Sequence, residues 1–378
     1  MQEEIAEVKA EDNLLLIEHT LRPITYTSWL LGVGIARPQK YPKAVTVIIR
    51  IIHSVLCSIE MIKEYKLENN SKCATANDVE YAFKSVQFVK WLICHVSTYY
   101  YVYNGISQFD KWPELMHRLE EIDQKIRKEI SMSDWRVIKV EALAIFATFA
   151  CCPLFLIVHV LYYYFAHPEC NYVSDLLFYY ISAQTLINSF VFNVIVYVLY
   201  YRFQTINKLI GQWDEISDAS WVALKIRRIR ELHSGIRVLI ITVNDTYGPH
   251  FLICSVNCFI MIVASLFKMS MDETCMDEKA FVIKDKMFWL LHVMQFGLTC
   301  WICTLAQEES QRTGTFVYAF VLNCKNLDVE CIRNEVNDFS VQLQQYRVAF
   351  TACNSFEVNN ALFIVFVAIT AVYLIILV

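Results

Sequence analysis

Long apolar stretches constrain the fold of this chain more than any other feature. A helix that crosses a bilayer needs about 20 mostly apolar residues, and we find seven such stretches. They are residues 44–62, 83–107, 137–165, 175–203, 249–269, 285–306 and 357–378. They are too long and too evenly apolar for the strands of a β-barrel. Only 19% of the residues are charged, against about a quarter in soluble domains. The sequence therefore predicts an all-α polytopic membrane protein with seven transmembrane helices.

The distribution of basic residues predicts the orientation. Loops that would share one side of the membrane hold 23 Lys and Arg, whereas loops on the other side hold seven. Because basic loops stay cytoplasmic, we expect a cytoplasmic N-terminus and an extracellular C-terminus. The acidic start of the chain has no signal-peptide pattern, so the first span would direct membrane insertion. This orientation places the sequon at Asn69 outside, where it can be glycosylated, and the sequon at Asn244 inside.

Apolar residues recur at helical spacing in the predicted cytoplasmic segments, which predicts long helical extensions of the spans. Two interpretations stay open: packing within one subunit, or contact between subunits. The repeats are Met116, Leu119, Ile122, Ile126 and Ile130; Ile229, Leu232, Ile236, Leu239 and Val243; and Ile332, Val336, Phe339, Leu343, Tyr346 and Phe350. Gly248 and Pro249 would form a hinge where the middle repeat enters the fifth span.

The predicted organisation has four parts. Residues 1–43 form a cytoplasmic N-terminal segment, and residues 44–306 hold helices one to six with a ligand pocket in their outer half. Residues 307–356 form cytoplasmic anchor helices, and residues 357–378 form a last helix.

Several kinds of chemistry find no support in the sequence. The net charge of -5 provides no basic surface for nucleic acid. None of the nine His lie at metal-ligand spacing, and neither a Gly-rich phosphate loop nor a nucleophile elbow occurs. We therefore expect no enzyme, no catalytic residue, no metal and no cofactor. Cys73, Cys170 and Cys275 fall in predicted outer loops, where one disulfide with three alternative pairings could form.

Aromatic and polar side chains gather in the outer thirds of the predicted spans. Apolar walls with a few convergent polar groups are typical of a small-molecule site. The candidate ligand-binding residues are Trp91, His159, Tyr163, Tyr180, Gln184, Trp289, His292 and Gln295. An interfacial aromatic belt is an alternative for the tyrosines, and hydrogen bonds between helices are an alternative for the polar residues. The aromatic excess favours a hydrophobic ligand over a sugar.

The last apolar stretch could line a pore. A wheel of 3.6 residues per turn groups six residues on one face, with Val378 at the outer end: Asn359, Phe363, Phe366, Thr370, Leu374 and Leu377. Asparagine at the cytoplasmic mouth would keep water there, and the apolar outer end would close by dewetting. In the alternative interpretation, Thr370 bonds the carbonyl four residues earlier in its own helix.

The C-terminal stretch FTACNSFEVNNALFIVFVAITAVYLIILV, residues 350–378, resembles the terminal signature of the insect gustatory receptors. That signature runs roughly FTAxGFFxLDxxLL, then an apolar stretch, then TYLVILIQF. The matching residues are Phe350, Thr351, Ala352, Phe356, Leu362, Tyr373, Leu374, Ile376 and Leu377. Asn354 and Ser355 replace Gly-Phe, Asn359 replaces Asp, Val372 replaces Thr, and the terminal Gln-Phe is absent.

The resemblance implies a ligand-gated nonselective cation channel in the plasma membrane of a sensory dendrite. Four subunits, as a homotetramer or a heterotetramer with related receptors, would surround one pore lined by the last helices. A small-molecule tastant of the bitter or another hydrophobic type would bind in the outer half of spans two to six. An odorant-receptor-like or partner-dependent channel subunit is the alternative. A G-protein-coupled receptor would need an external N-terminus, and a transporter would need matched helix breaks, whereas only Pro153 interrupts a span.

Overall fold

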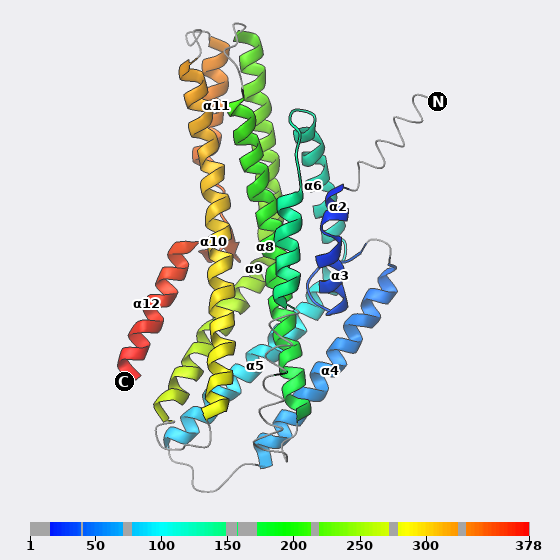
Figure 1. The fold of residues 1–378 in the computed structure, drawn as a ribbon, viewed down its shortest axis with the longest axis vertical. Helices are drawn as coiled ribbons and strands as arrows, with labels where there is room; N and C mark the ends of the chain where they lie inside the picture. The colour runs from blue at the N-terminus through cyan, green and yellow to red at the C-terminus, as the bar shows by residue number, and fades with distance from the viewer. Residues whose placement is uncertain are drawn as a thin grey trace.

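The computed structural model describes residues 16–38, 41–70, 78–148, 157, 172–212, 219–271, 279–323 and 330–377. Most of these residues are helical, and they include one two-stranded hairpin (Figure 1). Some of the predictions above concern residues outside this part of the chain. These are His159, Tyr163, Val378 and the three outer-loop cysteines, together with the side chains of Asn69, Trp289, Leu374 and Leu377.

Three long helices form the centre of the molecule: α8 (Tyr172–Gly211), α9 (Ala219–Met271) and α10 (Lys279–Asn323). The 53 residues of α9 correspond to about 80 Å at 1.5 Å per residue, more than twice the thickness of a bilayer's hydrocarbon core. These helices therefore extend well beyond a membrane. The predicted boundary at residue 306 lies within continuous helix, because α10 runs through it. α9 likewise stays helical across Pro249.

The other helices surround this centre. α4 (Lys43–Asn70) and α5 (Asp78–Ser107) pack against each other and against α8, and α6 (Lys111–Arg127) lies along α9. Residues 135–148 are also helical. The short helices α2 (Leu16–Thr20) and α3 (Arg22–Leu30) contact α6 and α8 respectively. α11 (Glu330–Gln345) packs on α9 and α10, and α12 (Asn360–Leu377) ends the chain.

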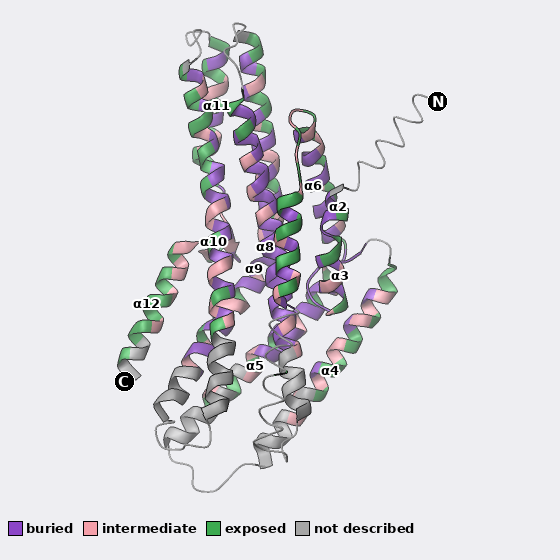
Figure 2. Ribbon diagram, in the orientation of Figure 1, coloured by how far each residue is buried: buried purple, intermediate pink, exposed green. Residues whose placement is uncertain are grey.

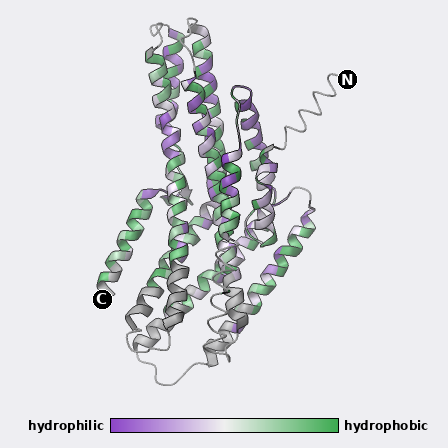
Figure 3. Ribbon diagram, in the orientation of Figure 1, coloured by the Kyte–Doolittle hydropathy of each residue, from purple (hydrophilic) through white to green (hydrophobic). Residues whose placement is uncertain are grey.

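Four helical segments among the described residues are long and apolar enough to cross a membrane: Lys43–Lys63, Tyr180–Gly211, Ser220–Ala264 and Leu290–Leu322. They overlap the predicted first, fourth, fifth and sixth spans. A shorter apolar helix covers Asn360–Val372, and Figure 3 shows that α12 is apolar along most of its length. Exposed isoleucines on one side of α4, such as Ile48, Ile52 and Ile59, suit contact with lipid. The count of seven spans and the orientation of the termini stay predictions.

The core follows the predicted periodicity. Figure 2 shows buried residues concentrated along α8 and the sides of the helices that face it. The whole repeat from Ile229 to Val243 is buried within this single chain. In the last repeat, Ile332, Phe339 and Phe350 are buried, whereas Tyr346 is half exposed. Much of the heptad pattern is therefore satisfied by packing inside one subunit.

A buried ion pair joins α6 to α8. The Arg202 guanidinium donates two hydrogen bonds of 2.6 Å to the Asp123 carboxylate and one of 3.2 Å to Asp134. The Arg202 and Asp123 side chains are 0% and 1% exposed. Burial raises the pKa of the Asp123 carboxyl, and the Arg202 guanidinium opposes that rise. Because removing one partner would leave a buried charge uncompensated, this pair fixes how α6 sits on the central helices.

A tight hairpin joins the α11 segment to α12. Its antiparallel strands are β1 (Thr351–Ala352) and β2 (Phe356–Glu357), with Cys353 and Asn354 between them at φ 51° and 56°. Asparagine tolerates this left-handed region better than most residues. The Asn244 side chain on α9 holds the preceding backbone: its amide donates to Ala349 O (2.8 Å) and its oxygen accepts from Thr351 N (3.2 Å).

Candidate functional site

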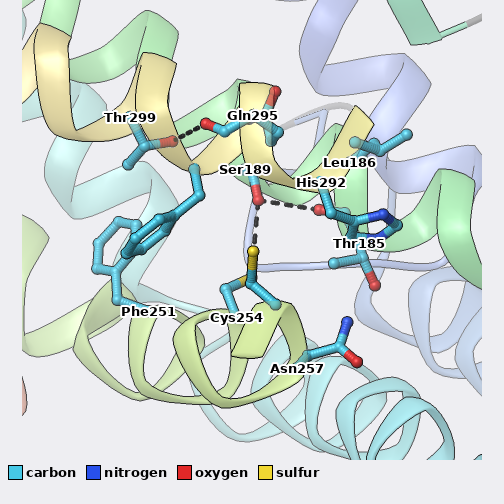
Figure 4. A pocket seen from close by; sticks show the side chains of 11 residues that line it. Thr185, Leu186, Ser189, Phe251, Cys254, Asn257, His292, Gln295 and Thr299 are labelled. Carbon is cyan, nitrogen blue, oxygen red and sulfur yellow. Dashed lines mark hydrogen bonds between the residues drawn. The ribbon is translucent and has the colours of Figure 1, made fainter. Parts of the chain in front are cut away.

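Side chains of α8, α9 and α10 enclose a small internal cavity (Figure 4). Thr185 and Ser189 contribute from α8, Cys254 from α9, and His292 and Gln295 from α10. The aromatic rings of Phe251 and Phe296 and the side chains of Leu186 and Asn257 complete much of the wall. The result is an apolar chamber with a few polar groups, which is the composition expected of a small-molecule site.

The cavity is nearly closed in this conformation. Its accessible volume is about 20 Å³, enough for about one water molecule, whereas drug-sized ligands occupy pockets of about 300–1,000 Å³. A ligand larger than water must therefore displace side chains of the wall when it binds.

A chain of hydrogen bonds supports one wall of the cavity. His250 on α9 pairs through Nε2 with Ser189 Oγ (3.0 Å) and through Nδ1 with the Tyr101 hydroxyl of α5 (3.0 Å). Ser189 Oγ also donates to Thr185 O (3.1 Å), and Cys254 Sγ lies 3.8 Å from Ser189 Oγ. These contacts tie α5, α8 and α9 together at this wall of the cavity.

The structure brings two of the predicted ligand residues into the cavity. His292 and Gln295, one turn apart on α10, both line it, with 9% and 8% of their surface exposed. Sequence reasoning did not select Ser189, His250 or Cys254. A sequence pattern could have indicated these residues: polar side chains four residues apart within apolar stretches lie on one helix face. Two such pairs are Thr185 with Ser189 and His250 with Cys254.

Tyr180 and Gln184 lie elsewhere. The Gln184 amide donates to Leu31 O (2.7 Å) and to the Tyr180 hydroxyl (2.9 Å). The Tyr180 hydroxyl donates in turn to Leu31 O (3.2 Å) and pairs with His53 of α4. These side chains of α8 hold the turn after α3.

Trp91 is packed within a group of aromatic rings on α5. Its ring lies 4.6 Å from the ring of His95 and 5.5 Å from that of Phe88, centroid to centroid. It does not line the α8–α10 cavity.

The predicted pore face of α12 contacts α10 within the chain. Phe363 and Phe366 have ring centroids 6.3 Å and 5.1 Å from Phe296. The Thr370 hydroxyl donates to Phe366 O (2.8 Å), the local bond considered above. Asn359 caps the helix, because its Oδ1 accepts from Leu362 N (3.0 Å). The large apolar side chains most open to the surroundings, among the described residues, lie on the other sides of α12: Ile364, Val365, Val367, Ile369, Val372 and Ile375.

Phe296 takes part both in the cavity wall and in the contact between α10 and α12. It lines the cavity on one side and packs against Phe366 on the other. A molecule that displaces wall side chains at Phe296 would therefore press directly on α12.

Long apolar helices around a small internal cavity are typical of a helical membrane protein. The chain matches the family model described as 7tm Chemosensory receptor over residues 21–378, and it belongs to that family. The resemblance to insect chemoreceptors noted in the C-terminal stretch is confirmed at this level. No curated protein sequence matches the chain.

Two similar solved structures share the fold. One is the insect olfactory receptor OR5 from Machilis hrabei, with a TM-score of 0.65 and 13% identity. The other is the same receptor in complex with eugenol, with a TM-score of 0.61 and 14% identity. Each comparison covers 97% of this chain and 99% of that chain.

Proposed function

We propose that the chain is a subunit of a gustatory receptor that works as a ligand-gated, nonselective cation channel. A small-molecule tastant of the bitter or another hydrophobic type binds in the α8–α10 cavity, and cations pass along α12. The observation that carries the proposal is the position of Phe296 between the cavity and Phe366 of α12. Ligand binding and movement of the last helix are thereby linked through one side chain.

The open face of α12 supports a role in an assembly. Apolar side chains such as Ile364 and Ile375 are 66% and 76% exposed in the single chain. In the proposed tetramer in the plasma membrane, this face meets the central pore and the neighbouring subunits, and the pore closes by dewetting between apolar rings. The packed face, including Phe363 and Phe366, transmits movement from α10.

An odorant-receptor-like or partner-dependent subunit is the second candidate. The observation that favours it is the likeness to an olfactory receptor, one structure of which holds eugenol. Eugenol is a small, uncharged, ring-bearing molecule, the kind of ligand that the uncharged wall of this cavity would accept.

Whole-cell voltage clamp on cells that express the chain alone tests the proposal. A nonhydrolysable GDP analogue in the pipette blocks G proteins while sugars, alkaloids and terpenoids are perfused. We expect a prompt cation current that survives the block and whose conductance changes in an Ile364→Ala variant. A current abolished by the block refutes the channel. A current that needs a co-expressed related receptor favours the second candidate.

A further inference from the structure

The polar groups of the cavity wall are almost all satisfied by the protein itself. Thr185, Ser189 and Thr299 each donate their hydroxyl to a carbonyl four residues earlier, at 3.3, 3.1 and 3.0 Å. The Asn257 Oδ1 accepts from Cys94 Sγ at 3.8 Å, and His292 is engaged in a contact of its own. These groups therefore already have partners within the protein.

Gln295 is the exception. Its side-chain Nε2 is buried and has no hydrogen-bond partner, and it is the one such nitrogen or oxygen among the described residues of the cavity wall. The residue is more than nine-tenths buried. A buried amide N–H without a partner is costly, so this position is one that a bound molecule can stabilise by supplying an acceptor.

We propose that Gln295 determines ligand specificity by donating a hydrogen bond to the oxygen of a small neutral ligand, such as a ketone, an ester or a lactone. This inference rests on the proposed function, because it concerns the same cavity. The apolar body of the ligand packs against Phe251, Phe296 and Leu186. Because Gln295 precedes Phe296 on α10, the hydrogen bond also places that body against the ring that touches α12.

The wall also excludes two other ligand classes. No Asp, Glu, Lys or Arg is among the residues that line the cavity in the described part of the chain, so a protonated amine would be buried without a counter-charge. A sugar brings several hydroxyls to a wall that offers one open donor, and each buried hydroxyl left without a partner weakens binding.

Three ring compounds of matched shape test the inference. Cyclohexanone carries the acceptor oxygen, methylenecyclohexane replaces that oxygen with a CH₂ group, and cyclohexylamine is a cation at neutral pH. Binding is measured on the purified full chain as ligand-dependent thermal stabilisation, which reports affinity whether or not the protein conducts. Currents for the same compounds are recorded in parallel.

We expect cyclohexanone to bind about five- to tenfold more tightly than methylenecyclohexane, the contribution of one hydrogen bond, and cyclohexylamine not to bind. In Gln295→Met, which keeps the length of the side chain, the ratio of the two affinities should fall to about one, because the donor is gone. Gln295→Glu should bind cyclohexylamine, because it adds the missing counter-charge.

Gln307→Met is the matched control. Gln307 lies on the same helix and is also buried with an unpartnered Nε2, but it does not line the cavity. It should leave the affinity ratio unchanged. Equal affinity of the wild type for cyclohexanone and methylenecyclohexane, or an unchanged ratio in Gln295→Met, overturns the inference. Selective binding without current from the chain alone or with a partner receptor overturns the proposed channel and leaves the role of Gln295 intact.

Discussion

The contact between Phe296 and Phe366 provides a direct test of how the cavity and the last helix communicate. The two rings have centroids 5.1 Å apart and planes inclined at 59°. Aromatic pairs of this kind contribute about 0.5–1.5 kcal/mol beyond the burial of their area. If the pair rearranges when the channel opens, that energy changes the ratio of open to closed channels by about two- to twelvefold.

A double-mutant cycle isolates this energy. Phe296→Ala, Phe366→Ala and the double variant are compared by the ligand concentration that gives half-maximal current. Phe296→Ala alone also removes part of the ligand's binding wall, so its own effect mixes affinity with gating. The cycle cancels that part, because the wall is missing equally in the single and double variants. We expect an interaction energy of about 0.5–1.5 kcal/mol.

Ile364→Ala serves as the control. Ile364 is 66% exposed and lies on the face of α12 away from Phe296. The effects of Phe296→Ala and Ile364→Ala should therefore be additive to within about 0.3–0.5 kcal/mol. If Phe296→Ala and Phe366→Ala are additive to the same degree, the two rings do not transmit the signal, and the reasoning that links the cavity to α12 through Phe296 fails.

Three further predictions concern thermal unfolding in detergent. Asp123→Ala should destabilise the protein by about 3–5 kcal/mol, since it leaves Arg202 buried with a reduced set of acceptors. Glu114→Ala, which removes the partner of the exposed Arg118, should cost about 0–1 kcal/mol. Equal losses of stability in Asp123→Ala and Glu114→Ala would contradict the argument that burial makes the Arg202–Asp123 pair important. Asn354→Ala should cost about 1–2 kcal/mol because of its positive φ, whereas Asn354→Gly should be tolerated. Asn359→Ala should cost about 0.5–2 kcal/mol through the lost helix cap, and Asn359→Ser, which keeps a capping oxygen, should cost less.

The long helices and much of the core were predictable, because they depend on periodicity alone. The repeat from Ile229 to Val243 is one buried stripe of α9, as its spacing of three and four predicts. Phe363 and Phe366, which the wheel of the last helix places on one face, both pack against Phe296. A wheel cannot tell what that face meets, and in this chain it meets α10.

The cavity was only partly predictable for a related reason. Gln184 and Gln295 look alike in the sequence, as amides inside apolar stretches. Gln184 reaches Leu31 O, in a turn more than 150 residues away along the chain, whereas Gln295 has its amide nitrogen left open. Which amide nitrogen finds an acceptor depends on where that distant turn is placed by tertiary packing, and helical spacing carries no information about it.

Two departures from the gustatory signature, at Asn354 and Asn359, keep the local backbone conformation. Asn354 stands where the signature has glycine, at a positive φ that asparagine also adopts. Asn359 stands where the signature has aspartate, and its side-chain oxygen caps α12 as a carboxylate would. Asn360 N donates to Thr304 Oγ1 on α10 (2.8 Å), so the first residue of α12 is bonded to α10. Further along α12, Phe363 and Phe366 pack against Phe296 of α10, and α12 also contacts α9. In the proposed channel, a ligand that displaces Phe296 would therefore push on α12 at Phe366, beyond the residue that is bonded to α10.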